Sequence, residues 1–412
     1  MKETWRNKMI ERNEIYKEIA PYIDKPIIKV ISGIRRCGKS TFMTLLIKRF
    51  VDKGVLESNI LYINKELLEF EFITDYAALN LYVKEKLSGN SEKKYLFIDE
   101  IQEIKDWEKA ITSFLAEGII DIYITGSNSR MLSSELATLL TGRYVLISMY
   151  PLSFKEFLTF RGEKALVIED EFQLYLKYGG LPGIHNLPLV DEIIFQYINS
   201  IYNTILLKDI VARYAIRDVS LFEKIASFVF DNIGNITSAK RISDYIKSQN
   251  IKVSVDTVQN YISFLNDAFL TFKAQRYDIK GKKHLEIYEK YYSSDSGIRH
   301  SVLGYRYDDI SMLLENIVYI ELLRRGYRVT IGKLDSYEVD FIAQKNNEKI
   351  YFQVTYLLSG KETVEREFRP LLKINDNYPK IVLSMDKIWG GDKDGIKRIN
   401  LIDFLLNPLN DL

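Results

Sequence analysis

One nine-residue stretch restricts the folds open to this chain more than any other feature of its sequence. It reads Gly33-Ile34-Arg35-Arg36-Cys37-Gly38-Lys39-Ser40-Thr41 and fits the pattern G-x-x-x-x-G-K-[ST]. An apolar run at residues 26–32 precedes it, and a helical pattern at residues 41–50 follows it. A strand, a glycine turn and a helix N-terminus direct several backbone N–H groups at one anion. The stretch therefore predicts a phosphate-binding loop in an α/β domain with a parallel sheet.

The residue types within this loop predict how it holds a nucleoside triphosphate. Gly33 and Gly38 allow a close backbone approach that a Cβ atom would block. We expect Lys39 to reach the β- and γ-phosphates and the Ser40 hydroxyl to bind Mg²⁺. The predicted nucleotide-binding residues are Gly33, Arg35, Arg36, Cys37, Gly38, Lys39, Ser40 and Thr41.

Two arginines and the only cysteine of the chain also lie in the loop. Arg35 and Arg36 contact either the nucleotide or a partner, and the sequence leaves both alternatives open. We expect Cys37 to be a small filler residue and not a nucleophile. A single cysteine excludes a disulfide framework and fits a reducing compartment, so we expect a cytoplasmic protein. No segment has the apolar length that crosses a membrane, and no membrane partner is expected.

A second motif predicts the acids that a hydrolase needs. The run Lys94-Tyr95-Leu96-Phe97-Ile98-Asp99-Glu100 has four consecutive apolar residues, which suits a parallel strand buried on both faces. Asp99 falls at the carboxyl end of that strand, where open α/β sheets bind their ligands. We expect Asp99 to hold Mg²⁺ and Glu100 to orient or deprotonate the attacking water. Taken alone, the same pattern also describes a strand that ends in two solvated acids.

A third strand pattern at residues 119–126 ends in the polar segment Ser127-Asn128. We expect Asn128 or Ser127 to touch the γ-phosphate or the attacking water, although a turn built for backbone reasons explains the same residues. Arg143 lies just before a fourth apolar run at 144–149. It is predicted either to stabilise the transferring phosphoryl group, in cis or from a neighbouring subunit, or to be a surface cation.

The length of 412 residues predicts several domains. After about residue 152 the pattern turns helical, and in residues 236–292 it becomes helix, turn, helix and hairpin, the order of a winged helix. The predicted domains are an N-terminal helical segment (1–24), a P-loop ATPase core (25–158), a helical lid (159–232), a winged helix (233–300) and a nuclease-like α/β domain (301–412).

The two middle segments carry candidate contacts. Lys208 or Arg213 of the lid is predicted either to sense nucleotide or to lie on a solvated helix face. Residues 236–292 contain ten Lys and Arg against six Asp and Glu, and this local positive charge fits either a DNA surface or a winged helix used for protein packing. The candidate DNA contacts are Thr257, Gln259, Asn260, Lys280, Lys282 and Lys283.

The last segment places Glu315 on a helix, Asp340 at a strand end and Gln353 on the next strand. This layout matches nucleases that hold Mg²⁺ between acids, with a lysine two residues after the last ligand. Here the last ligand position is the neutral Gln353, and residue 355 is threonine. Because only two acids remain, we expect a retained fold with lost or weak cleavage.

Together these motifs make the chain resemble prokaryotic AAA+-type P-loop ATPases with a C-terminal restriction-endonuclease-like domain of unknown function. The resemblance covers nearly the whole chain and rests on residues 33–41, 96–102, 124–143, 151–157, 179–182, 338–341 and 353–354. It implies ATP and Mg²⁺ as cofactors, ATP hydrolysis, a winged-helix connector and a degenerate nuclease-like end.

We therefore expect an ATPase in which Lys39, Ser40, Asp99 and Glu100 carry the chemistry, and which signals through the lid and winged helix to the terminal domain. Three uses of that activity stay open. They are a switch whose output is a protein contact or homo-oligomer, a DNA-acting machine, and a nuclease gated by ATP.

Overall fold

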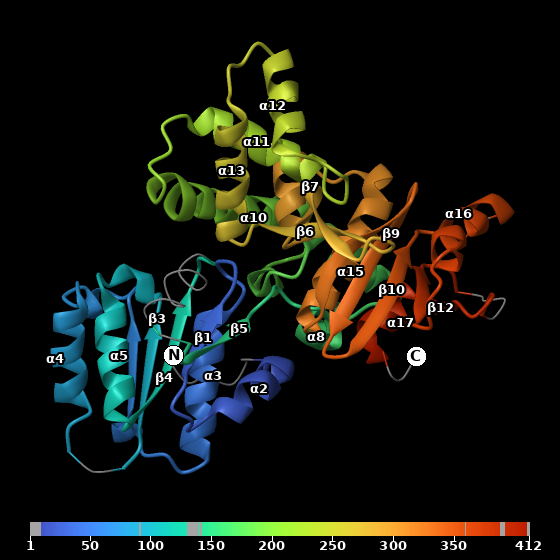
Figure 1. The fold of residues 1–412 in the computed structure, drawn as a ribbon. Helices are drawn as coiled ribbons and strands as arrows, with labels where there is room; N and C mark the ends of the chain where they lie inside the picture. The colour runs from blue at the N-terminus through green and yellow to red at the C-terminus, as the bar shows by residue number, and fades with distance from the viewer. Residues whose placement is uncertain are drawn as a thin grey trace. The chain divides into compact units, whose positions relative to one another are not determined.

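The computed structural model describes residues 10–89, 92–129, 140, 142–358, 360–387 and 392–409, with the side chains of 286 and 287 left aside. The chain forms two compact units (Figure 1). The first contains Met1–Met149 and Asp267–Phe269, and the second contains Tyr150–Asn266 and Leu270–Leu412. No helix within the described ranges is long and apolar enough to cross a bilayer.

The first unit is built on a five-stranded parallel sheet with the order β2-β3-β4-β1-β5. Its strands are β1 (Ile28–Ser32), β2 (Ile60–Asn64), β3 (Lys94–Asp99), β4 (Ile120–Gly126) and β5 (Tyr144–Ser148). Its helices are α2 (Asn13–Ile19), α3 (Lys39–Asp52), α4 (Tyr76–Lys86) and α5 (Trp107–Glu117). The strands predicted from the apolar runs are confirmed, and β4 lies between β1 and β3, so three carboxyl ends meet at one edge.

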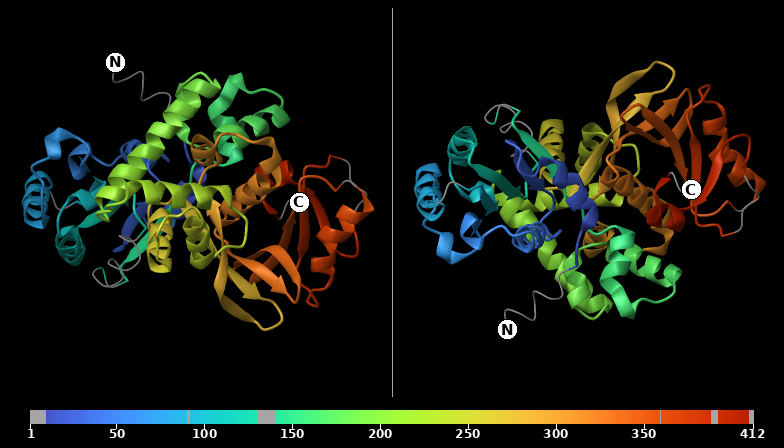
Figure 2. Two further views of the ribbon diagram at one scale, coloured as in Figure 1. Left: turned by 90° about the horizontal axis from the view of Figure 1, so that it is seen from above. Right: turned by 90° about the horizontal axis from the view of Figure 1, so that it is seen from below.

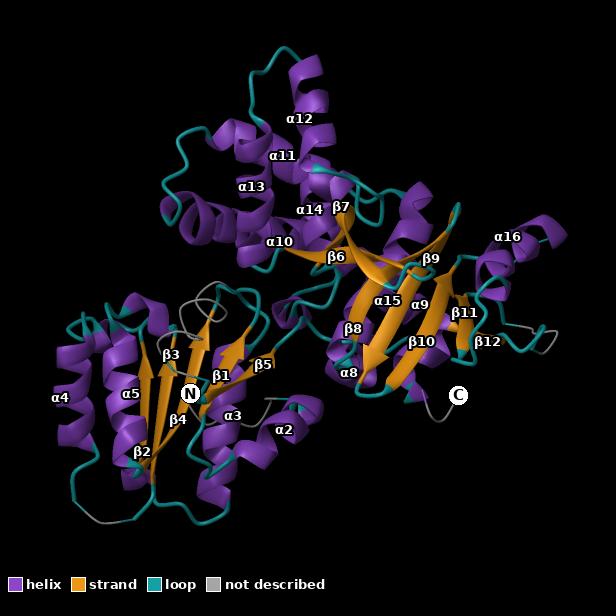
Figure 3. Cartoon of the chain, viewed as in Figure 1, coloured by secondary structure: helices purple, strands orange, loops and turns teal. Residues whose placement is uncertain are grey.

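Side chains of β3 alternate between two apolar layers, because successive residues of a strand point to opposite faces. Leu96 and Ile98 pack in a core with Trp107 and Phe114 of α5. Phe97 faces the other way, stacked on Tyr123 at 4.6 Å and close to Phe50 of α3. Helices therefore cover both faces of the sheet (Figure 3), which explains why β3 is a continuous apolar run.

The second unit begins with a helical stretch, as the sequence predicts for residues 154–232. A capping box starts it, in which the Ser153 hydroxyl accepts from the backbone N–H of Glu156 and the Glu156 carboxylate accepts in return. Gly179 breaks the stretch with a φ of 74°. The helices are α8 (Phe154–Arg161), α9 (Ile168–Tyr178), α10 (Asp191–Thr204), a π-helix (Ile205–Ala212) and α11 (Val219–Asp231).

A seven-stranded mixed sheet follows, with the order β12-β11-β10-β9-β8-β6-β7. Its strands are β6 (Thr271–Asp278), β7 (Lys283–Ser293), β8 (Arg328–Leu334), β9 (Tyr337–Lys345), β10 (Glu348–Val354), β11 (Lys380–Ser384) and β12 (Lys397–Asn400). The remaining helices of this unit are α12 (Ala239–Ser248), α13 (Val255–Asp267), α14 (Ser296–Leu303), α15 (Ile310–Arg324), α16 (Lys361–Leu372) and α17 (Leu401–Leu406). Of these, α14, α15, α16 and α17 contact strands of the sheet.

The hairpin β6–β7 is present as predicted, but it does not form a sheet of its own. Residues 276–278 of β6 pair in parallel with residues 331–333 of β8. The strands coloured yellow through red lie side by side in Figure 2. The boundary predicted between residues 300 and 301 therefore runs through one continuous sheet, and β12 is a strand that the sequence patterns did not indicate.

Candidate nucleotide site

The loop at residues 33–41 connects β1 to α3 and has the tight geometry that its glycines predict. A Cβ atom on Gly33 would lie 2.0 Å from the carbonyl oxygen of Met149, so no larger residue fits there. Gly38 precedes α3 with a φ of 106°, and Arg36 adopts a left-handed φ of 67°, which is uncommon outside glycine. The loop therefore approaches the backbone of Met149 closely at Gly33, where a side chain would clash.

Lys39, the first residue of α3, is buried and lies inside the loop. Its Nζ donates to the carbonyl oxygens of Gly33 at 3.0 Å and Ile34 at 3.3 Å. The same Nζ lies 3.8 Å from Oε1 of Glu100. Ser40 follows on the same helix and is partly buried, and Thr41 is exposed. The phosphate loop and the acids after β3 thus meet, as the two motifs predict.

Asp99 ends β3 and is fully buried. One of its carboxylate oxygens accepts from the Thr125 hydroxyl of β4, and the other accepts from the Tyr62 hydroxyl at 3.2 Å. Burial and the adjacent carboxylate of Asp99 raise the pKa of Tyr62, so this phenol stays a donor. Both oxygens of Asp99 are therefore held in fixed directions.

Glu100 adopts a left-handed φ of 54°, with its backbone N–H bound to the Thr125 hydroxyl at 3.0 Å. Its Oε2 accepts from the amide of Gln102 and from the Ser127 hydroxyl at 3.2 Å. Burial raises the pKa of Glu100, but Lys39 and these hydrogen bonds outweigh burial and leave the pKa below its ordinary value. Glu100 is thus an ionised carboxylate within reach of the loop lysine.

The polar end of β4 lies at the same edge. Ser127 contacts Glu100, and Asn128 is buried directly after it. Arg143 lies elsewhere, because its carbonyl accepts from the N–H of Ile28 at the first residue of β1. The loop leaves the other end of that strand, about 13 Å away at 3.3 Å per residue. The structure does not bring Arg143 to the loop of its own chain, and its role in trans stays a prediction.

The sequence motifs did not predict several contacts of the site. Arg12 donates to the carbonyl of Cys37 at 3.2 Å, and Arg35 pairs with Glu66 at 3.2 Å. Arg36 is exposed. Burial raises the pKa of the Cys37 thiol, which agrees with a filler residue. Gln102 was not predicted as a site residue from the sequence, although its position two residues after Glu100 allows the contact with that carboxylate.

The acids of the terminal segment also come together, but around a lysine. Nζ of Lys290 lies 3.0 Å from Glu315 and 2.7 Å from Glu338. Asp340 accepts from the N–H of Val354, and burial together with Glu315 raises its pKa well above the ordinary value. The described residues contain no group of three or more His, Cys, Asp or Glu placed to hold a metal ion.

The next residue of this layout, Gln353, is neutral as the sequence shows. Its Oε1 accepts from the N–H of Asp340 at 3.4 Å, and its amide donates to Glu367 at 3.2 Å. Thr355 is buried one residue beyond β10. The local cation is therefore the ammonium of Lys290, which the sequence layout did not reveal.

The remaining candidates lie on the surface of the second unit. Lys208 on the π-helix and Arg213 at its end are exposed. Gln259 and Asn260 are exposed on α13, as are Lys280, Lys282 and Lys283 at the turn of the hairpin. The Thr257 hydroxyl already contacts Ser254 at 2.8 Å. Their roles in sensing and in DNA contact stay predictions.

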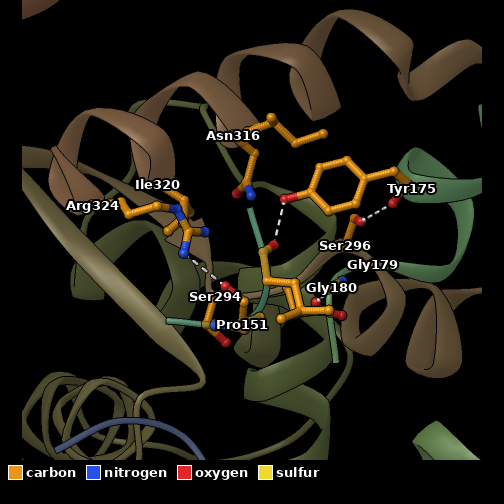
Figure 4. Close-up of a pocket in the computed structure, with 12 residues that line it drawn as sticks. Pro151, Tyr175, Gly179, Gly180, Ser294, Ser296, Asn316, Ile320 and Arg324 are labelled. Carbon is orange, nitrogen blue, oxygen red and sulfur yellow. Dashed lines mark hydrogen bonds between the residues drawn. The ribbon is translucent and has the colours of Figure 1, made fainter. Parts of the chain in front are cut away.

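A small, partly open pocket of about 20 Å³ lies in the second unit (Figure 4), and none of the predicted nucleotide-binding residues lines it. Tyr175 donates to the carbonyl of Leu152 at 2.9 Å across it, and Arg324 donates to that of Pro151 at 2.8 Å. The buried Asp295 accepts from the N–H groups of Gly180 at 2.6 Å and Ile298 at 3.1 Å. The two bonds of Asp295 connect the Gly179-Gly180 turn to the start of α14, which indicates that the pocket has a structural role.

Comparison with known proteins identifies the first unit independently of its geometry. Residues 25–158 match a family model described as an AAA domain, and residues 169–309 match a domain of unknown function (DUF8612). Among solved structures, a Walker-type ATPase of Pyrococcus abyssi is 13% identical with a TM-score of 0.49, covering 72% of this chain and 97% of that chain.

Two relatives extend the similarity over the whole chain. An uncharacterized protein of Haemophilus influenzae is 39% identical over 401 residues, covering 97% of this chain and 99% of that protein. An uncharacterized protein of Methanocaldococcus jannaschii is 33% identical over 407 residues, covering 90% and 86%. The chain therefore belongs to the same family as these two uncharacterized proteins, and its own residues 25–158 form an AAA-type ATPase domain.

Proposed function

We propose that this protein is a Mg²⁺-dependent ATPase. The observation that carries the proposal is the meeting of Lys39 with Glu100 at 3.8 Å beside a loop in which a Cβ on Gly33 would clash with backbone. Such a cradle fits a polyphosphate, and the donor set of Ser40 and Asp99 consists of the oxygen ligands that Mg²⁺ prefers. When bound there, Mg²⁺ supplies charge neutralisation for the phosphate groups.

The residues of the chain divide the remaining work. Loop N–H groups and Lys39 bind the phosphates, for which Lys39 exchanges the carbonyls of Gly33 and Ile34 for phosphate oxygens. Glu100, ionised and fixed by Gln102 and Ser127, orients the attacking water and accepts its proton. Asn128 is proposed to contact the γ-phosphate or the water from the end of β4. Hydrolysis is coupled to the second unit and, through it, to a partner.

Two substitutions test this assignment. Lys39→Ala is expected to abolish ATP hydrolysis and weaken ATP binding. Glu100→Gln is expected to retain ATP binding and lower turnover by about 10²-fold to 10⁴-fold, the usual contribution of a general base. Lys48→Ala, an exposed lysine on the same helix, serves as the control. Turnover in Lys39→Ala equal to that of the control variant contradicts the proposal.

A second candidate function is DNA binding by the second unit. The order α12, α13, β6 and β7 fits a winged helix, and the exposed lysines Lys280, Lys282 and Lys283 gather at the turn of its hairpin. Binding of duplex DNA that weakens steeply with salt, and more so in the triple Lys→Ala variant, supports this use. ATP turnover unaffected by duplex, branched or single-stranded DNA favours a switch that contacts protein.

The nuclease-like fold of residues 301–412 is proposed on its helix and strand order, with cleavage lost or weak. Lys290 already neutralises part of the charge that Glu315 and Asp340 would offer a metal. Metal-dependent DNA nicking that is absent in Asp340→Ala would establish cleavage and overturn this view.

A further inference from the structure

The side chain of Gln102 binds one oxygen of Glu100 and leaves the other oxygen toward Lys39. We propose that Gln102 is a positioning residue for hydrolysis, which sets the orientation of the Glu100 carboxylate so that Oε1 receives the proton of the attacking water. The inference rests on the proposed ATPase function. It adds a residue that lies outside both the phosphate-binding loop at residues 33–41 and the run at residues 94–100.

The contacts of Glu100 distinguish its two oxygens. Oε2 accepts from the amide of Gln102 and from the Ser127 hydroxyl, whereas Oε1 faces Nζ of Lys39 at 3.8 Å. The amide of Gln102 also lies 3.5 Å from the Ser127 hydroxyl, so the two donors form one cluster. An oxygen that already accepts two hydrogen bonds is a poor proton acceptor. Oε1 is therefore the oxygen left for the water.

The Gln102 amide is oriented so that its NH₂ group donates to Glu100. Its carbonyl Oε1 is buried and has no hydrogen-bond partner within the described residues. Turning the amide over would place that carbonyl against the carboxylate of Glu100, which is repulsive. The side chain thus leaves its own acceptor unpaired in order to donate to a charged group, since hydrogen bonds to charged groups are the stronger kind.

The backbone around Glu100 explains why the carboxylate depends on this donor. Glu100 and Gln102 flank the start of the short helix Ile101–Glu103, and Glu100 itself has a left-handed φ of 54°. Its N–H is bound to the Thr125 hydroxyl at 3.0 Å, which fixes the main chain. The main chain does not fix the rotation of the carboxylate, so Gln102 and Ser127 set that rotation.

Two variants test the inference. Gln102→Met removes the hydrogen-bond donor and keeps the side-chain volume, whereas Gln102→Ala removes both. We expect kcat for ATP to fall about 10-fold to 100-fold in both, because one hydrogen bond to a charged group is lost, while the Kd for ATP changes less than about 3-fold.

Glu103→Gln, an exposed change on the same turn, is the matched control. A kcat unchanged in Gln102→Met and Gln102→Ala, or a loss of kcat fully explained by weaker ATP binding, overturns the inference. If Lys39→Ala is inactive while the Gln102 variants behave like Glu103→Gln, this inference alone fails. If Lys39→Ala is as active as wild type, the proposed function fails first.

Discussion

The buried ion pair between Lys29 and Asp121 offers the sharpest test of how the first unit holds its sheet together. Lys29 lies on β1 and Asp121 on the neighbouring β4, and both side chains are fully buried. Asp121 also accepts from the N–H of Asp24 at 2.9 Å and from the Tyr123 hydroxyl at 2.7 Å. Burial lowers the pKa of Lys29, and the charge of Asp121 opposes that effect.

Lys29→Met removes the cation and keeps an unbranched side chain of similar length. Asp121 then stays buried with a charge that only neutral donors contact. Removing one partner of a buried pair destabilises proteins by about 3–5 kcal/mol. With an m value of about 2 kcal/mol/M in urea, the unfolding midpoint should fall by about 1.5–2.5 M. Adding Asp121→Asn to Lys29→Met is expected to recover part of that loss.

Trp107 reports on the first unit because it is buried against β3 in the core. Urea unfolding is therefore followed by tryptophan fluorescence in a background where Trp5 and Trp389 are replaced by Phe. Lys84→Met serves as the control, since Lys84 pairs with Glu117 while 52% exposed, and its midpoint should not change. If the Lys29→Met midpoint equals that of the control, the reasoning that Lys29 compensates a buried charge on Asp121 is refuted.

Three further predictions concern other parts of the chain. Burial raises the pKa of Asp295 to about 6, above its unfolded value, so its contribution to stability is present below pH 4 and is lost as pH rises through 6. In unfolding free energies measured from pH 4 to 7, wild type should lose about 2 kcal/mol relative to Asp295→Asn, and parallel curves contradict this. Gly33→Ala should abolish ATP binding by equilibrium titration without changing the second unit, since its Cβ would meet Met149 at 2.0 Å. Lys290→Met leaves Glu315 and Glu338 without their shared cation, so its melting temperature should fall and Mn²⁺ should raise it more than in wild type. If Mn²⁺ raises the melting temperature equally in both proteins, Lys290 does not balance the charge of Glu315 and Glu338.

Local patterns determined the chemistry of the first unit. The loop at residues 33–41 and the acids Asp99 and Glu100 were recognisable because each motif lies within a few consecutive residues, and because apolar runs mark buried parallel strands. The same reasoning placed both motifs at the carboxyl edge of a sheet, since parallel strands share one direction.

Only the tertiary structure showed which residues outside these motifs contact the site. The order β3-β4-β1 put Thr125 and Ser127 against the two acids, and the register of β5 with β1 put Arg143 at the far end of the strand. Lys290 lies next to the acids of the terminal segment because β6–β7 joins the same sheet as β9 and β10. Strand order and register depend on contacts between residues far apart in sequence, and no pattern of neighbouring residues specifies them.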